Sequence, residues 1–135
     1  MRFLSLLVLP FLVACAEVPQ SEPCQTPEAC FMSEFMVQGL SPSIGQDFGG
    51  GVTLRNVQAA GSLVVLDLQL PIAGADLEDV QKRVLHDVAS QAFVDGFCED
   101  SNNDEVFQFG NAYQVRSVGN DGVLMGASTV RSCGG

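Results

Sequence analysis

The sequence predicts an α+β domain: a four-stranded, largely antiparallel sheet with one long helix packed on one face. Two pairs of β-rich segments flank one long amphipathic segment, which gives the order β-β-α-β-β. The length of 135 residues and the 47% hydrophobic content suit one small domain. Four of the five cysteines lie outside the N-terminal region, and an even number of this kind indicates disulfides formed in an oxidising compartment.

The N-terminus has the pattern of an export signal. Met1-Arg2 supplies a positive start, and residues 3–14 form a nearly unbroken apolar run. This run has the length of a signal-peptide core and is shorter than the roughly 20 residues that a membrane-spanning helix needs. We therefore expect residues 1–14 to be a signal peptide.

The end of this run resembles the lipobox of bacterial lipoproteins, with Cys15 directly after Leu12-Val13-Ala14. The resemblance implies cleavage before Cys15 and attachment of a diacylglycerol to its thiol, and several acyl chains hold a protein more firmly than one. In such lipoproteins an Asp after the cysteine favours retention in the inner membrane, and this chain has Ala16. The resemblance thus implies a lipid anchor in the outer membrane, facing the periplasm. The alternative is an ordinary secreted protein with Cys15 at this position by coincidence.

Residues 15–50 read as the lipidated cysteine, a tether and a short helix. The segment 16–27 is rich in Pro and polar residues and predicts the tether. A short helix between Glu28 and Leu40 follows, because apolar side chains recur there at i and i+4. That face either packs on the domain core or binds a partner protein, since Met and Phe adapt to varied surfaces. The residues of this candidate partner-binding face are Phe31, Met32, Phe35 and Met36.

The globular domain is expected over residues 51–135 and begins with a hairpin. Segments 52–59 and 62–70 are rich in Leu and β-branched residues and are separated by Ala60-Gly61. Alternate residues of the second segment are apolar, whereas Asp67 and Gln69 point to the other side. One face of this hairpin should therefore be buried and the other partly hydrated.

The long helix is predicted from Asp76 to about Phe97. Asp76 is a suitable N-cap, and two acidic residues follow in the first turn, where the helix dipole favours them. Apolar residues that recur at three- and four-residue steps predict which face of this helix covers the sheet. This expected core face comprises Leu77, Val80, Val84, Val88 and Ala92 and is widened by Leu85, Ala89 and Phe93. The expected solvated side comprises Lys82, Arg83, His86 and Asp87.

A turn-rich segment joins the helix to a second hairpin. Asp104 could cap one short helical turn through Phe109, or a strand could begin at Phe107. Segments 112–118 and 123–130 then flank Gly119-Asn120-Asp121-Gly122, whose residues tolerate the positive φ angles of a tight turn.

Four cysteines allow three disulfide connectivities, and spacing favours Cys24 with Cys30 and Cys98 with Cys133. The second bond would close a loop of roughly 35 residues and contribute about 4 kcal/mol in the loop-entropy model. Metal binding is the competing interpretation of the cysteines. It is disfavoured because the chain has no Cys-x-x-Cys pair, and no metal or other cofactor is expected.

Several functions are disfavoured by composition. Six basic against 16 acidic residues give a formal charge of −10, so the chain lacks the basic surface that nucleic-acid binding requires. The only His is expected on a solvated helix face, which disfavours a nucleophilic triad. The acidic pairs at 99–100 and 104–105 are expected in a solvated loop, and Gly49-Gly50-Gly51 lacks the Lys of a phosphate loop. We expect no enzymatic activity.

A set of landmarks from residue 50 to the C-terminus resembles a known family. They are the strand Val64-Val65-Leu66-Asp67-Leu68-Gln69-Leu70-Pro71, the amphipathic helix ending at Cys98, Gly110-x-x-Tyr113, the turn at Asn120-Asp121-Gly122 and Thr129-Val130-Arg131-Ser132-Cys133. The pattern is similar to the β-type pilotins of type II secretion systems, small outer-membrane lipoproteins with an α+β fold. In that group a cysteine after the main helix pairs with one behind the last strand. The Cys24/Cys30 pair is an addition to the family pattern, and Cys98-Glu99-Asp100-Ser101 departs from the family's Cys-Ala-Asp-Pro.

The resemblance implies a non-enzymatic, lipid-anchored module that guides a secretin or another envelope component to the outer membrane. Such a domain would receive an amphipathic segment of its client in a groove beside the helix or the sheet edge. The alternative is a periplasmic inhibitor or small-ligand binder, because an acidic lipoprotein can cover a basic enzyme by charge complementarity.

Overall fold

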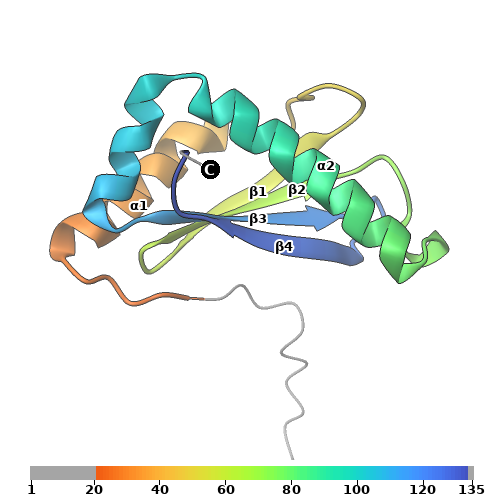
Figure 1. The fold of residues 1–135 in the computed structure, drawn as a ribbon, viewed down its shortest axis with the longest axis horizontal. Coiled ribbons are helices and arrows are strands. Elements are labelled where there is room, and N and C mark those ends of the chain that lie inside the picture. The colour runs from red at the N-terminus through yellow and green to blue at the C-terminus, as the bar shows by residue number, and fades with distance from the viewer. Residues whose placement is uncertain (1–20, 134–135) are drawn as a thin grey trace, which may run out of the picture.

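The computed structural model describes residues 21–133, apart from the side chains of Ser101, Asn102 and Asp104. The expected signal peptide and Cys15 lie outside these residues. Within them, helices cover one face of a four-stranded sheet (Figure 1). This is the α+β class that the sequence predicts.

The sheet has the strand order β1-β2-β3-β4, and two of its three pairings are antiparallel. The central pairing, β2 with β3, is parallel, because the helix α2 carries the chain back across the sheet between these strands. The sheet is therefore mixed, with one hairpin on each side of a parallel junction. The strands are β1 (Thr53–Ala60), β2 (Leu63–Gln69), β3 (Ala112–Val118) and β4 (Leu124–Val130).

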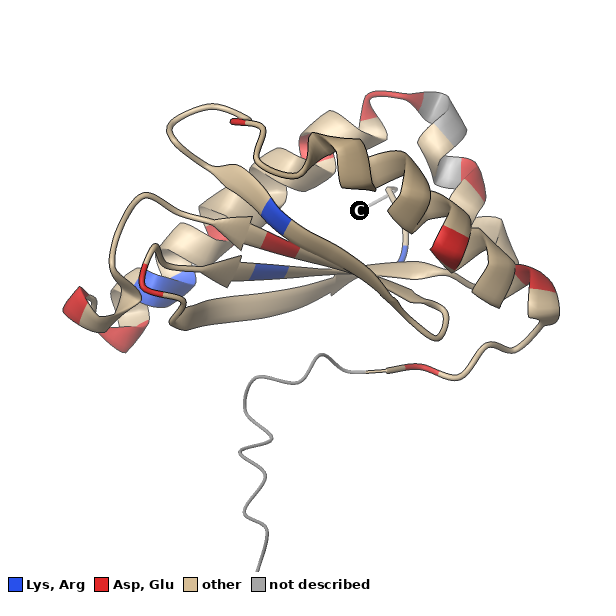
Figure 2. Cartoon of the chain, turned by 180° about the vertical axis from the view of Figure 1, so that it is seen from behind, with Lys and Arg blue, Asp and Glu red and all other residues tan. Residues whose placement is uncertain are grey.

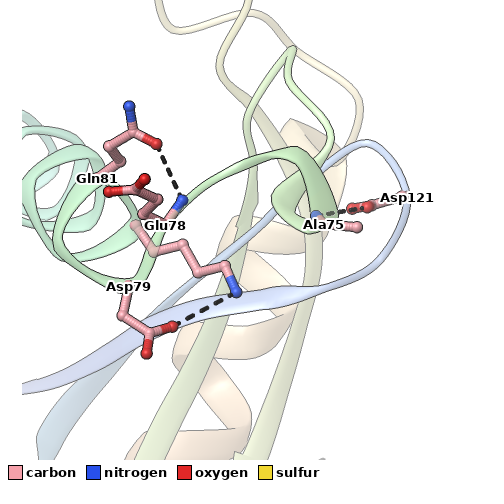
Figure 3. A network of polar contacts seen from close by, with 6 residues as sticks. Ala75, Glu78, Asp79, Gln81 and Asp121 are labelled. Carbon is pink, nitrogen blue, oxygen red and sulfur yellow. Dashed lines mark hydrogen bonds and ion pairs between the residues drawn. The ribbon is translucent and has the colours of Figure 1, made fainter.

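The helix α2 (Asp79–Cys98) begins later than the sequence predicts. Asp76 does not cap it, because Gly74–Asp76 form a separate 3-10 helix, η3. The N-cap is Glu78, whose backbone N–H donates to Gln81 Oε1 at 2.9 Å in a capping box (Figure 3).

Asp121 in the β3–β4 turn holds η3 in place. Its carboxylate accepts hydrogen bonds from the backbone N–H groups of Gly74 and Ala75, each at 3.0 Å, and the second is drawn in Figure 3. These N–H groups lower the pKa of Asp121. The turn between the last two strands thus fixes the entry to α2.

The predicted core face of α2 is correct for Leu77, Leu85, Ala89 and Phe93, which are buried or pack against the core, and wrong for its valines. The side chains of Val80, Val84 and Val88 are exposed, at 60%, 54% and 65%. The buried residues of α2 are His86, Ala89 and Ser90, and the partly buried Phe93 and Phe97 continue the same side. The valines thus form an apolar stripe on the outward side of the helix. The inward side mixes apolar residues with the polar His86 and Ser90.

His86 was expected on the solvated side, and this prediction is also wrong. His86 is 4% exposed and lies between α2 and the sheet. Its Nδ1 is 2.7 Å from Ser117 Oγ in β3, and its Nε2 is 2.6 Å from Ser128 Oγ in β4. Gly126 makes room for the ring, since a Cβ there would lie 2.6 Å from His86 Cγ. Both ring nitrogens are therefore satisfied inside the fold.

The predicted short helix is present as α1 (Pro27–Leu40), with Thr26 as its N-cap. Asn111, at the residue before β3, fixes α1 to the sheet layer. Its side-chain amide donates to the carbonyl of Ala29 and to Ser33 Oγ, each at 2.8 Å. Ala29 and Ser33 are the buried residues of the helix.

The main core lies between the sheet and the helices. Its fully buried side chains come from β1, β2 and β3, with Val106 from η4 (Ser101–Phe109), which occupies the segment that could have begun a strand. This core comprises Leu54, Val57, Val64, Leu66, Leu68, Val106, Tyr113 and Val115.

Both disulfides favoured by spacing are present. Cys24 bonds Cys30, and Cys98 at the end of α2 bonds Cys133 behind β4. The latter closes the α2–η4–β3–β4 segment across a separation of 35 residues.

The segment before α1 is attached to the sheet through Glu22. The N–H of Glu22 donates to the carbonyl of Ala60 at 3.3 Å, and the N–H of Ser62 donates to the carbonyl of Glu22 at 2.9 Å. The Glu22 carboxylate forms an ion pair with Arg131, and the Arg131 guanidinium lowers the pKa of Glu22. We call these contacts, together with the Cys24–Cys30 disulfide, the N-terminal clip.

The clip requires a glycine at position 61. Gly61 has φ +65°, and a Cβ there would lie 1.7 Å from the carbonyl oxygen of Glu22. Only glycine allows the two backbones to approach this closely.

Candidate functional site

An apolar groove of about 410 Å³ runs along α2. One side is α2, the other is the segment between α1 and β1, and Leu68 of β2 contributes from the sheet. We call it the α2 groove. It is lined by Leu40, Phe48, Gly49, Val52, Leu68, Ala89, Ala92, Phe93, Gly96 and Phe97.

Small residues on α2 leave this groove open. Ala89, Ala92 and Gly96 lie at three- and four-residue steps on one side of the helix. A Cβ at Gly96 would meet no other atom within 4 Å, so the space beside Gly96 is empty. The position therefore has room for a side chain beside the groove.

Aromatic rings form part of the groove wall. The Phe93 and Phe97 rings stack with centroids 6.0 Å apart, and Phe97 lies edge-on to Tyr113 at 4.6 Å. Tyr113 is buried in β3, and burial raises the pKa of its hydroxyl. The wall is thus joined directly to the core of the sheet.

No residue that lines the α2 groove carries an ionisable side chain. Carboxylates stand next to it in the sequence: Asp47 accepts from the Gly49 N–H at 2.7 Å, and Asp95 accepts from Gln91 Nε2 at 2.7 Å. Figure 2 shows how acidic residues outnumber basic ones over the helices and loops. The groove can bind apolar side chains, and its acidic border favours a ligand with positive flanks.

A second, polar hollow lies on the sheet face away from the helices. Asp67 of β2 is its centre, with Arg116 Nε 3.6 Å from Asp67 Oδ1 and Arg55 on the neighbouring strand. Burial raises the pKa of Asp67, and the two guanidinium groups oppose that shift. Two guanidinium groups thus face one carboxylate, which leaves this cluster with a net charge of +1 on the sheet face away from the helices.

The predicted partner-binding face on α1 is divided by the structure. Met32 and Met36 pack against the core, whereas Phe31 and Phe35 are 69% and 58% exposed. The Met pair therefore packs on the core, and the Phe pair is exposed. Binding of a partner protein by the Phe pair stays a prediction.

Among the described residues, no group of three or more His, Cys, Asp or Glu side chains is arranged to hold a metal ion. Neither helix of this part of the chain is both long and apolar enough to cross a membrane. The predicted lipid attachment site, Cys15, lies outside the described residues.

The family resemblance implied a groove beside the helix or the sheet edge, but the residues that line the α2 groove were not predicted from the sequence. Its lining comes from separate segments, and its defining residues are the small ones, Ala89, Ala92 and Gly96. Alanine and glycine in a helix carry no pattern that marks an opening. The one usable signal was Gly96 inside a helix, where glycine is unfavourable and calls for a reason.

The size and apolar lining of the α2 groove suit either a small apolar ligand or the apolar face of a helix. The same fold occurs in the type II secretion system pilotin AspS from Vibrio cholerae, with a TM-score of 0.57 and 20% identity over 76% of this chain and 88% of that one. It also occurs in the pilotin EpsS of the Vibrio vulnificus type 2 secretion system, with a TM-score of 0.59 and 14% identity over 76% and 87%. A third similar structure, from Pseudomonas aeruginosa, has a TM-score of 0.58 and 11% identity over 76% and 88%.

No family model and no curated sequence matches the chain. The fold that the sequence landmarks implied is therefore confirmed by structures, at identities that establish the fold alone.

Proposed function

We propose that this protein is a lipid-anchored envelope module that binds an amphipathic segment of a client in the α2 groove. Acyl chains on Cys15 would hold the complex at the outer membrane, facing the periplasm. The client would be a secretin subunit or another component of an envelope secretion machine. The protein would act by binding, without catalysis.

The observation that carries this proposal is the uncharged lining of the α2 groove on a pilotin-like fold. Apolar side chains spaced along one face of a client helix would fill the space beside Ala92 and Gly96. Each well-buried apolar side chain contributes about 1.5–3 kcal/mol, so a few anchors are enough for specific binding. The acidic border would then select segments with Lys or Arg beside the apolar face.

Filling the groove tests its role. In Gly96→Phe the new ring would occupy the empty space beside α2, whereas the matched Gly96→Ala leaves most of it open. Wild type and Gly96→Ala should capture a secretin subunit from solubilised cell envelopes, and Gly96→Phe should lose this capture by about tenfold or more. Mass spectrometry of the captured material identifies the client.

Two results would count against the proposal. Equal capture by Gly96→Phe would move the binding site elsewhere on the protein. Recovery of no secretin and no other secretion component by the wild type would remove the proposed client. The anchor is tested separately, because Cys15→Ser should abolish acylation in the intact mass and release the protein from the membrane.

A second candidate function follows from the charge of −10. The protein could cover a basic periplasmic enzyme as an inhibitor, through its acidic surface rather than the groove. That binding should weaken strongly at about 0.5 M salt, where exposed charges are screened, whereas capture through the apolar groove should persist.

A further inference from the structure

Two large apolar side chains on α1 are left without a partner inside the domain. Phe31 and Phe35 lie one helical turn apart and are 69% and 58% exposed. They do not line the α2 groove, and the core face of α1 is formed by other residues. An exposed aromatic pair of this kind marks a contact surface.

The N-terminal clip places this pair near the start of the chain. The Cα atoms of Cys24 and Cys30 are 5.5 Å apart. Glu22 is two residues before Cys24, and Phe31 directly follows Cys30. At about 3.8 Å between successive Cα atoms, Phe31 is within about 17 Å of the point where Glu22 meets the sheet.

The length of chain before the clip sets how far the anchor can lie from Phe31. Seven residue steps separate Cys15 from Glu22. A fully extended segment of that length spans at most about 25 Å. A bilayer that holds acyl chains on Cys15 is therefore within reach of the exposed face of α1.

The charges of α1 indicate which lipid surface it can approach. Its only charged residues, Glu28 and Glu34, are exposed, and it carries no Lys or Arg. Anionic lipid would repel this face, whereas a zwitterionic surface would not.

We propose that Phe31 and Phe35 enter the interface of a zwitterionic phospholipid bilayer beside the acyl chains of Cys15. This contact rests on the acylation in the proposed function. It would hold α1 against the membrane and fix the orientation of the domain. Val52 of the α2 groove lies at the opposite end of β1 from the clip, so this end of the groove would be directed away from the membrane.

Tryptophan fluorescence can test this contact, because the chain contains no Trp. Full-length acylated Phe31→Trp and Phe35→Trp proteins are reconstituted on phosphatidylcholine vesicles with brominated acyl chains, which quench only tryptophan that reaches them. We expect quenching of about twofold relative to unbrominated vesicles, with a blue-shifted emission. Added phosphatidylglycerol should reduce it.

Phe48→Trp is the matched control. Phe48 is 54% exposed, and its N–H donates to the carbonyl of Val52. Val52 directly precedes β1, and Gly61 directly follows it, so the two lie at opposite ends of this strand. Its emission should be the same on both kinds of vesicle. Stronger quenching at this position than at Phe31→Trp would reverse the orientation and overturn the proposal.

Flotation of the vesicles separates this contact from the anchor. If the wild-type chain does not float with vesicles, the anchor itself is refuted, and this surface with it. If the proteins float but Phe31→Trp and Phe35→Trp remain unquenched, only the bilayer contact is refuted. Unquenched emission that shifts to the blue when the secretin client is added would assign the pair to that protein instead.

Discussion

At the scale of the single residue, His86 decides how α2 is attached to the sheet. Its two ring nitrogens contact hydroxyls on two neighbouring strands, Ser117 of β3 and Ser128 of β4. Within the described residues the ring faces no carboxylate across these contacts, and Asp87, the next residue on α2, is exposed. Burial therefore dominates and lowers the pKa of His86.

This lowered pKa predicts a loss of stability in acid. The unfolded chain binds the proton near pH 6.5, and the folded protein resists it, so the contribution of His86 is complete above about pH 6.5 and falls as the pH decreases toward the folded pKa. His86→Gln keeps a side chain that can hydrogen bond and removes the titration. Urea denaturation at about pH 7.5 and about pH 5 should show a larger loss of unfolding free energy in the wild type than in His86→Gln.

The shifted pKa values of Asp67 and Glu22 also make stability depend on pH, but His86→Gln does not change these two residues. Burial raises the pKa of Asp67, which favours the folded state on acidification, and the lowered pKa of Glu22 acts in the opposite direction. Both are present in wild type and in His86→Gln, so they cancel in the comparison. Parallel pH dependences of the two proteins would contradict the assignment to His86.

At the scale of the element, α2 shows where a hydrophobic pattern misleads. Val84 is 54% exposed on this helix, whereas Val64 of β2 is fully buried. Val84→Ala should be neutral or stabilise the protein by up to about 0.6 kcal/mol, because alanine is the better helix former. Val64→Ala should cost on the order of 2 kcal/mol through the lost burial and the cavity it leaves.

Thermal or urea denaturation of the two variants provides the check. A large loss for Val84→Ala would place the valine stripe in the core after all. The paired design is useful because the chemical change is the same in both proteins, and only burial differs.

The strands could be predicted closely because β-branched and leucine-rich runs end at strong turn residues such as Gly61 and Gly119. The face of α2 could be predicted only in part: Ala89 and Phe93 belong to the predicted stripe, but the inward side also carries His86 and Ser90, and the outward side carries valines. A polar side chain can be buried when it is hydrogen-bonded. The sequence alone does not reveal that Ser117 and Ser128 of the sheet lie opposite the His86 ring. The later start of α2 has a similar cause, since the Asp121 contact that forms η3 comes from a distant turn.

The candidate site was predicted less well than the fold. Phe31 and Phe35 could be singled out because their i, i+4 spacing on a short helix is visible in the sequence. The α2 groove depends on how α2, Leu68 and the segment after α1 meet, so its open space, including that beside Gly96, is a property of the assembled fold.

At the scale of the whole molecule, the two disulfides contribute unequally. The Cys98–Cys133 bond spans a separation of 35 residues and the Cys24–Cys30 bond a separation of 6. In the loop-entropy model their contributions are about 4 and about 2 kcal/mol. Replacing each pair by Ser and measuring denaturation should therefore show the larger loss for Cys98/Cys133. Equal losses, or a larger one for Cys24/Cys30, would contradict this ranking.

The N-terminal clip also determines how the domain would bear tension. A pull from the N-terminal side reaches Glu22 first, where backbone hydrogen bonds on both sides attach it to the β1–β2 turn. The Cys24–Cys30 bond passes any remaining force to the first turn of α1. Val52 of the α2 groove lies at the opposite end of β1, so a pull on the N-terminal side would act on the backbone hydrogen bonds of Glu22 before it reached that end of the groove.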